Sequence, residues 1–160
     1  MVSPSIHERF LRRALELAKD NAISGRGGPF GAIVARGDEI VAEGVNLVTA
    51  SLDPTAHAEV NAIREACRKL GTFTLQDCTL YSSCEPCPMC LSAIYWARLG
   101  ALYFAGTRQD AARAGFDDSL LYEQIALPMF ERRLRTVRLL DSDGAAPFEA
   151  WLRHPGRISY

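Results

Sequence analysis

The sequence lacks the long hydrophobic run that a membrane-spanning protein needs. No segment approaches the ~20 consecutive apolar residues required to cross a bilayer, and residues 1–13 are polar and charged, without the apolar core of a secretory signal. A strong charge imbalance is also absent, because the formal net charge is -1. Proteins that hold nucleic acid by its phosphates usually carry a basic face. These absences predict a cytoplasmic protein without a membrane partner, and they disfavour a nucleic acid as partner without excluding RNA.

The even set of cysteines that is typical of a secreted disulfide scaffold is missing as well. The five cysteines are an odd number, which argues against a disulfide framework. Cys84, Cys87 and Cys90 fall within seven residues, and such clustering in a reducing compartment indicates a bound metal. Cys67 and Cys78 stand apart and are predicted to be core residues.

Helical and strand patterns alternate along the 160 residues, which is the size of one domain. Apolar spacing and capping residues predict helices over residues 5–20, 53–70, 86–97, 108–114, 119–124 and 148–153. Strands are predicted over residues 30–35, 40–42, 78–82, 101–105 and 134–140. Because strands that alternate with helices form sheets covered on both faces, we expect an α/β fold, a three-layer α/β/α sandwich with a mixed five-stranded sheet.

Two short motifs carry the chemistry, and each is predicted to open a helix. They are His57-Ala58-Glu59 and Pro86-Cys87-Pro88-Met89-Cys90, which together give the H-x-E and P-C-x-x-C signature of zinc deaminases. Cys87 and Cys90 are three residues apart and share a helix face. With His57 they would supply three zinc ligands and leave the fourth position to water. Glu59 is then the predicted general base, provided that it and His57, which lie on different helix faces, both sit in the first turn.

Cys84 leaves other interpretations of the cluster open. Cys84 and Cys87 also have the C-x-x-C spacing, and a fourth protein ligand would make the zinc site closed and structural. The protein would then be a zinc-stabilised binding module without catalysis. An iron–sulfur cluster needs one more cysteine in a suitable position, and neither Cys67 nor Cys78 supplies the usual spacing.

At these motifs the sequence resembles the cytidine-deaminase superfamily, and within it the bacterial guanine deaminases. The matching blocks are Gly27 to Ala32, Asp53 to Glu59, Ser83 to Cys90 with Ile94 to Arg98, and Ala114 to Ser119. Residues 127–147 match poorly. The resemblance implies hydrolytic deamination of guanine to xanthine and ammonia by a zinc-bound hydroxide, with one Zn2+ per subunit.

The resemblance also implies roles for residues outside the two motifs. Asn46 would hydrogen-bond the purine ring, Phe30 would lie against its face, and Asp118 would contact the exocyclic amine or assist proton transfer. Tyr160 would help to close the pocket, often on the partner subunit of a domain-swapped homodimer. We therefore expect residues 1–160 to form a single zinc-dependent deaminase domain whose tail, about 148–160, caps an active site.

Each of these residues also has a purely structural interpretation. Asn46 follows a strand and could be a turn residue, and Phe30 could belong to the core. Asp118 could cap the helix that follows it, and Tyr160 could be a frayed terminus.

The substrate is the least determined part of the interpretation. Several of the matching blocks also occur in deaminases that act on adenosine in tRNA. Guanosine, cytosine and amino-triazines are further small substrates that the motifs allow, because the shape of the pocket decides among them.

Overall fold

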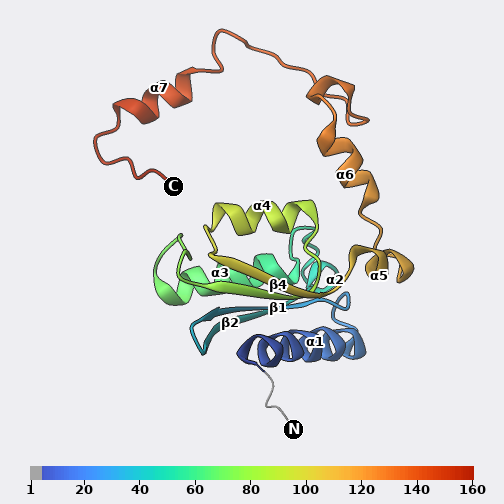
Figure 1. The fold of residues 1–160 in the computed structure, drawn as a ribbon. Coiled ribbons are helices and arrows are strands. Elements are labelled where there is room, and N and C mark those ends of the chain that lie inside the picture. Colours follow the sequence, from blue (N-terminus) through green and yellow to red (C-terminus); the bar gives the residue numbers. More distant parts are fainter. Residues whose placement is uncertain (1–4) are drawn as a thin grey trace. The chain divides into compact units, whose positions relative to one another are not determined.

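Helices cover both faces of a mixed sheet in the computed structural model, which describes residues 5–160 (Figure 1). The first four residues of the polar N-terminal stretch lie outside that range. The chain divides into two units, Met1–Asp118 and Ser119–Tyr160. The first unit contains, in order, α1 (Ile6–Ser24), β1 (Gly31–Arg36), β2 (Glu39–Val45), α2 (Val48–Ser51), α3 (Ala58–Leu70), β3 (Thr79–Cys84), α4 (Pro88–Trp96), β4 (Ala101–Gly106) and α5 (Arg108–Arg113).

The sheet has the strand order β2-β1-β3-β4. β1 is antiparallel to both β2 and β3, whereas β3 and β4 are parallel. The ends of β2, β3 and β4 and the start of β1 therefore share one edge of the sheet, as the pairing of Gly31 with Val45 and of Cys84 with Gly106 shows. The loops that carry the sequence motifs leave the sheet from this edge.

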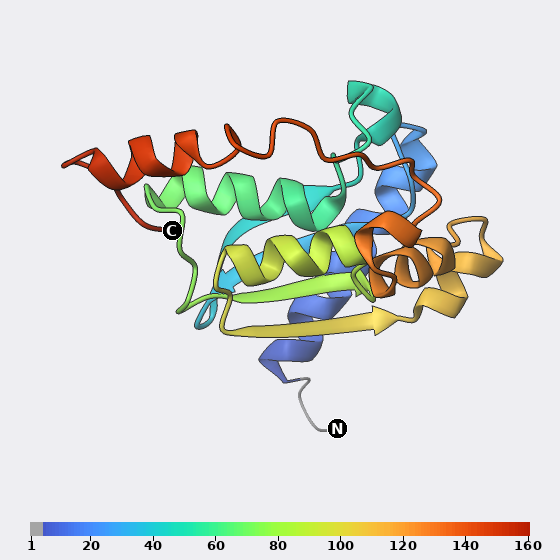
Figure 2. The same cartoon turned by 90° about the horizontal axis from the view of Figure 1, so that it is seen from above.

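Alternating side chains of the strands build a separate core on each face. On one face, Ala32 and Val34 of β1 join Leu80 of β3 under α3 and α4. On the other, Ile33 and Ala35 join Tyr81 and residues of α1. Figure 2 shows α3 and α4 next to each other above the strands, with α1 beneath them. The result is the three-layer arrangement that the alternation of patterns predicts.

Two glycines allow helices to approach the sheet at backbone distance. A Cβ atom on Gly44 would lie 2.3 Å from the backbone oxygen of Ala58 and 2.5 Å from the backbone nitrogen of Ala62. A Cβ atom on Gly31 would lie 2.4 Å from the backbone oxygen of Ala14 on the opposite face. Gly44 therefore sets how closely the N-terminal turn of α3 packs on β2.

The first unit agrees with the sequence-based expectation in its class, its layers and its mixed sheet, but the predicted fifth strand over residues 134–140 is wrong. The sheet in the described part of the chain has four strands. In the absent strand, Leu134, Val137, Leu139 and Leu140 do not alternate with polar residues, and Leu140 has a left-handed backbone with φ of 57°. A strand with one exposed face needs period-2 patterning, and any strand needs extended backbone.

The predicted start of α3 at Asp53-Pro54 is also wrong. The Asp53 carboxylate does accept hydrogen bonds, from the backbone nitrogen of Thr55 at 2.8 Å and from the Thr55 hydroxyl at 2.7 Å. These bonds close a local turn, which competes with helix formation. The helix begins only at Ala58, after His57 in extended conformation.

The second unit consists of α6 (Ser119–Ala126), a 3-10 turn η1 (Met129–Glu131) and α7 (Ala146–Arg153). The side chain of Arg132 donates to the backbone oxygen of Leu127 at 3.1 Å, and the backbone nitrogen of Arg133 donates to Gln124 Oε1 at 2.6 Å. No residue from 119 to 160 is buried. Within residues 5–160, no helix is long and apolar enough to cross a membrane.

Gly44→Ala should lower the free energy of unfolding by about 1–3 kcal/mol, because the added methyl group displaces the first turn of α3. Urea denaturation followed by circular dichroism measures the change. Glu39→Ala, on an exposed position of the same strand, serves as the control and should shift stability by no more than about 0.5 kcal/mol. Equal stability of the two variants would contradict the role given to Gly44.

Candidate active site

The N-terminal ends of α3 and α4 bring the two sequence motifs together. His57 is the N-cap residue of α3 and Cys87 is the N-cap residue of α4, and both have extended backbone. Neither side chain makes the hydrogen bond to the helix that an N-cap residue usually makes. The extended backbone of His57 places it outside the helical periodicity. This explains how His57 and Glu59 can approach one site although they are two residues apart.

His57, Cys87 and Cys90 form a group that could hold a metal ion. Their ligand atoms all lie within 4.8 Å of one another. His57 Nδ1 is 3.6 Å from Cys87 Sγ and 3.4 Å from Cys90 Sγ. One imidazole and two thiolates are a donor set that suits Zn2+, and three protein ligands leave a position open for water or substrate.

The charges in this group depend on one another. The hydrogen bond with Cys90 lowers the pKa of Cys87 to about 4, against the effect of burial, and His57 contributes in the same direction. The same contact with Cys87, together with burial, raises the pKa of Cys90. His57 has a raised pKa because it hydrogen-bonds the Cys87 sulfur. Cys87 lies at a helix N-terminus, which favours negative charge on its sulfur.

Glu59 lies next to the metal-binding group in the second position of α3. Its side chain is 6% exposed, and burial raises its pKa above the ordinary value. Its carboxylate accepts from Ser82 Oγ at 3.3 Å and from Cys90 Sγ at 3.4 Å. A buried carboxyl with raised proton affinity beside a metal site is suited to proton transfer near neutral pH.

Cys84 stands apart from the metal-binding group in the described residues. It is the last residue of β3, and its Sγ donates to the backbone oxygen of Thr107 at 3.4 Å. Burial and the nearby Glu59 carboxylate raise its pKa to about 11. The group whose ligand atoms lie within 4.8 Å of one another contains His57, Cys87 and Cys90 but not Cys84. This geometry does not favour the closed four-ligand site.

Asn46 is held rigidly at the end of β2. Its side-chain Oδ1 accepts from the backbone nitrogens of Gly28 at 3.2 Å and Val48 at 3.3 Å. Its backbone nitrogen donates to the backbone oxygen of Phe30 at 3.1 Å, and its backbone oxygen accepts from Asn21 Nδ2 at 2.7 Å. With Oδ1 occupied, the side-chain amide nitrogen is the group that Asn46 can offer to a ligand.

Phe30 lies beside Asn46 at the start of β1. Its ring meets the ring of Phe116 edge to face, with centroids 5.0 Å apart and planes at 86°. Gly28 lies close to both rings, since a Cβ atom at this position would lie 3.2 Å from the Phe30 ring and 3.3 Å from the Phe116 ring. Phe30 also packs against the core under α3 and α4, so the core interpretation holds without excluding contact with a ligand.

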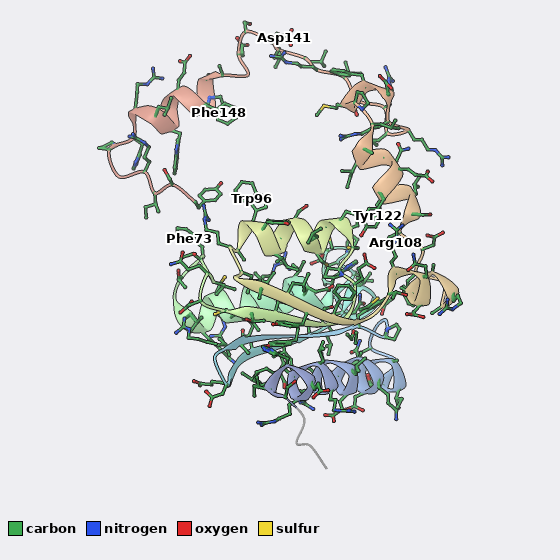
Figure 3. All side chains as sticks on the ribbon, viewed as in Figure 1. Phe73, Trp96, Arg108, Tyr122, Asp141 and Phe148 are labelled. Atoms are coloured by element: carbon green, nitrogen blue, oxygen red, sulfur yellow. The ribbon has the colours of Figure 1, made fainter. Side chains whose placement is uncertain are left out.

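Asp118 is half-buried at the end of the first unit, within electrostatic range of Cys87. Burial and the negative charge of Cys87 raise its pKa, whereas Arg108 acts in the opposite direction. Arg108 begins α5 (Figure 3), and its backbone nitrogen donates to Glu85 Oε2 at 3.3 Å.

Tyr160 belongs to the second unit and is 70% exposed.

Two residues at the site, Ser82 and Phe116, were not predicted from the sequence. Ser82 occupies an inward position of β3, two residues after the core residue Leu80, and a polar residue there is the signal that could have revealed it. Phe116 lies within the Ala114 to Ser119 block that carries the resemblance, but its type alone does not distinguish a pocket wall from a packing residue.

Comparisons with known proteins agree with this geometry. Residues 4–106 match the cytidine and deoxycytidylate deaminase zinc-binding region. Guanine deaminase of Bacillus subtilis is 51% identical over 96% of this chain and 99% of that protein. Its crystal structure has a TM-score of 0.94 and covers 96% of this chain.

Other relatives match over a smaller part of the chain. The structure of guanine deaminase from Nitrosomonas europaea is 34% identical, with a TM-score of 0.67 and coverage of 74% of this chain and 66% of that one. The tRNA-specific adenosine deaminase of Aquifex aeolicus is 44% identical, but over 61% of this chain and 64% of that protein. The similarity to the Bacillus subtilis guanine deaminase thus includes the second unit. The chain belongs to the cytidine and deoxycytidylate deaminase family, whose zinc-binding region it contains.

Proposed function

We propose that this protein is a guanine deaminase, which adds water to the amine-bearing carbon of guanine and releases xanthine and ammonia. The observation that carries the proposal is the buried carboxylate of Glu59 beside the His57, Cys87 and Cys90 group. This arrangement joins a metal site with an open position to a proton carrier. Similarity to a guanine deaminase over nearly the whole length supports the choice of substrate.

In this proposal His57, Cys87 and Cys90 hold the zinc ion. A bound zinc ion supplies Lewis acidity that lowers the pKa of a water molecule to near neutrality. The two helix N-termini supply partial positive charge to the cysteine sulfurs, which favours the thiolate form that a ligand requires.

Glu59 moves the protons of the reaction. Its carboxylate takes a proton from the attacking water and passes it to the ring nitrogen next to the reacting carbon. The second proton of the water, which remains on the newly added hydroxyl, reaches the exocyclic amine through Glu59 or Asp118, the carbon–nitrogen bond breaks as the carbonyl forms, and ammonia leaves. The raised pKa of both carboxyl groups brings their proton affinity closer to that needed at neutral pH.

The purine lies against the wall formed by the start of β1 and the end of β2. Asn46 donates from its amide nitrogen to the ring, since its Oδ1 already accepts from two backbone amides. Phe30 lies against the purine face, held there by its contact with Phe116. Gly27 packs directly against Asn46, because a Cβ atom at this position would lie 2.1 Å from the Asn46 backbone oxygen. The lack of a side chain at Gly27 therefore lets the two segments of this wall lie in contact.

The second unit completes the site in a homodimer. Its apolar side chains Phe148, Trp151 and Leu152 are 71%, 43% and 64% exposed, which leaves an apolar surface to be covered. Residues 148–160, with Tyr160, would cap the active site of the partner subunit by domain swapping, within one deaminase domain of residues 1–160.

All five cysteines are free, which supports a reducing, cytoplasmic setting.

Removal of a zinc ligand should abolish metal binding, whereas removal of the neighbouring cysteine should not. Cys90→Ser is expected to lose most of the bound zinc, because a serine hydroxyl is a poor ligand for zinc. Cys84→Ser is the matched control and should retain one zinc ion per chain. Metal content after dialysis, measured by plasma mass spectrometry, checks both variants. Loss of zinc from Cys84→Ser would instead indicate the closed structural site.

Glu59→Gln should retain zinc and lower the rate of ammonia release from guanine by at least about 10²–10⁴-fold, the usual contribution of general acid–base catalysis. Glu65→Gln, at a half-buried position of the same helix where Glu65 pairs with Arg68, is the control and should keep the wild-type rate. Guanosine, adenine, cytosine and tRNA are offered in parallel. Turnover of tRNA alone would move the protein to the RNA-acting branch, and full activity of Glu59→Gln would remove Glu59 from the mechanism.

The homodimer is checked by sedimentation equilibrium of the full chain. The wild type is expected at twice the mass of the 160-residue chain. A chain shortened to residues 1–147 should lose guanine turnover while it retains zinc. A monomeric wild type with full activity contradicts the swapped arrangement.

A further inference from the structure

Ser82 is a buried polar residue of the sheet that the proposed mechanism does not use. Its side chain is 2% exposed, in the central part of β3. Its backbone is paired with Ala32 of β1 on one side and with Phe104 of β4 on the other. The hydroxyl donates to Glu59 Oε1 at 3.3 Å.

The position of Ser82 makes its hydroxyl a fixed point. A residue paired on both sides within a sheet has little backbone freedom, and serine has a single side-chain torsion before its oxygen. Glu59 has three such torsions and leaves the first turn of a helix, so its carboxylate needs external contacts to hold one orientation. Ser82 provides such a contact from a different layer of the fold.

Metal binding would remove the other side-chain contact of this carboxylate. Cys90 Sγ donates to Glu59 Oε2 at 3.4 Å, but a cysteine that ligates zinc is a thiolate and has no proton to donate. Among the described residues, Ser82 then remains as the side-chain donor to the carboxylate. It occupies Oε1 and leaves Oε2 directed toward the metal-binding group.

We propose that Ser82 is a positioning residue, which holds Glu59 Oε1 so that Oε2 is aimed at the reacting water and the purine. The proposal rests on the proposed function of Glu59 as the proton carrier. Ser82 itself touches neither the metal nor the substrate in this scheme. Its effect should therefore appear in the rate of the chemical step rather than in substrate binding.

Ser83 offers a matched control on the same strand. It is 5% exposed, and its hydroxyl accepts from the backbone nitrogen of Gly31 at 3.0 Å, on the opposite face of the sheet. Ser83→Ala removes the same atom from the same strand without a contact to Glu59. Any general weakening of β3 should therefore affect both alanine variants.

The experiment measures kcat and KM for guanine with the zinc-loaded full chain. Ser82→Ala should lower kcat about tenfold, the size expected for one lost hydrogen bond to a charged group, and leave KM and zinc content unchanged. Ser82→Thr retains the hydroxyl and should stay within about twofold of the wild type, as should Ser83→Ala. In the Glu59→Gln background, Ser82→Ala should add no further loss, because the residue acts through Glu59.

Several results would overturn the proposal. They are an equal loss of kcat in Ser82→Ala and Ser83→Ala, a loss that persists undiminished in the Glu59→Gln background, and a loss of zinc from Ser82→Ala. Lack of rescue by Ser82→Thr, with a folded protein, would also count against it.

A crystal structure of zinc-loaded Ser82→Ala gives a readout that does not depend on turnover. A Glu59 carboxylate that rotates away from its wild-type position supports the proposal, and one that stays in place contradicts it. If the wild type fails to release ammonia from guanine, the proposed substrate is wrong, and this structure still decides the role of Ser82.

Discussion

The structure depends on one constraint, which is that two helices must begin at the same edge of the sheet. β3 leads into α4 and β2 leads toward α3, so His57 and Cys87 arrive next to each other as N-cap residues. Serine, threonine, aspartate and asparagine are the usual residues there, and their replacement costs about 1 kcal/mol per helix. The fold carries this cost at both helices, and in return two metal-binding side chains are directed out of the helix ends.

The same constraint sets the electrostatics of the site. Helix N-termini carry partial positive charge, which offsets the negative charge that Cys87 and Cys90 bring to a small buried volume. Glu59 extends from the first turn of α3, where an acidic residue is favoured by the helix, yet burial raises its pKa. These opposing effects leave a carboxyl group able to hold a proton and to release it. Close packing of α3 at Gly44 determines where this group lies.

Sequence patterns predicted the site better than they predicted the boundaries of the elements. The H-x-E and P-C-x-x-C spacings identified three side chains that the structure brings within 4.8 Å of one another. Asp53-Pro54 has the residues of a helix start, but the Asp53 carboxylate accepts a hydrogen bond from the backbone nitrogen of Thr55 and closes a local turn instead. Residues 134–140 are rich in leucine but lack strand periodicity. Ser82 was not predicted because its role depends on how β3 packs against α3 in three dimensions, which no local sequence pattern encodes.

The wall proposed to contact the purine is also held from the face of the sheet opposite the metal-binding group. Asn21 of α1, 1% exposed, donates to the backbone oxygens of Gly28 at 2.9 Å and Asn46 at 2.7 Å. Asn46 in turn holds the Gly28 backbone nitrogen. The loop before β1 and the end of β2 are thus held by α1, and Asn61 Nδ2 of α3 also donates to the backbone oxygen of Val45 at 2.9 Å, so this wall is attached to both helix layers. The position of the wall relative to the metal-binding group then depends on how closely α1 and α3 pack on the sheet, where Gly31 and Gly44 let helix backbone approach strand backbone.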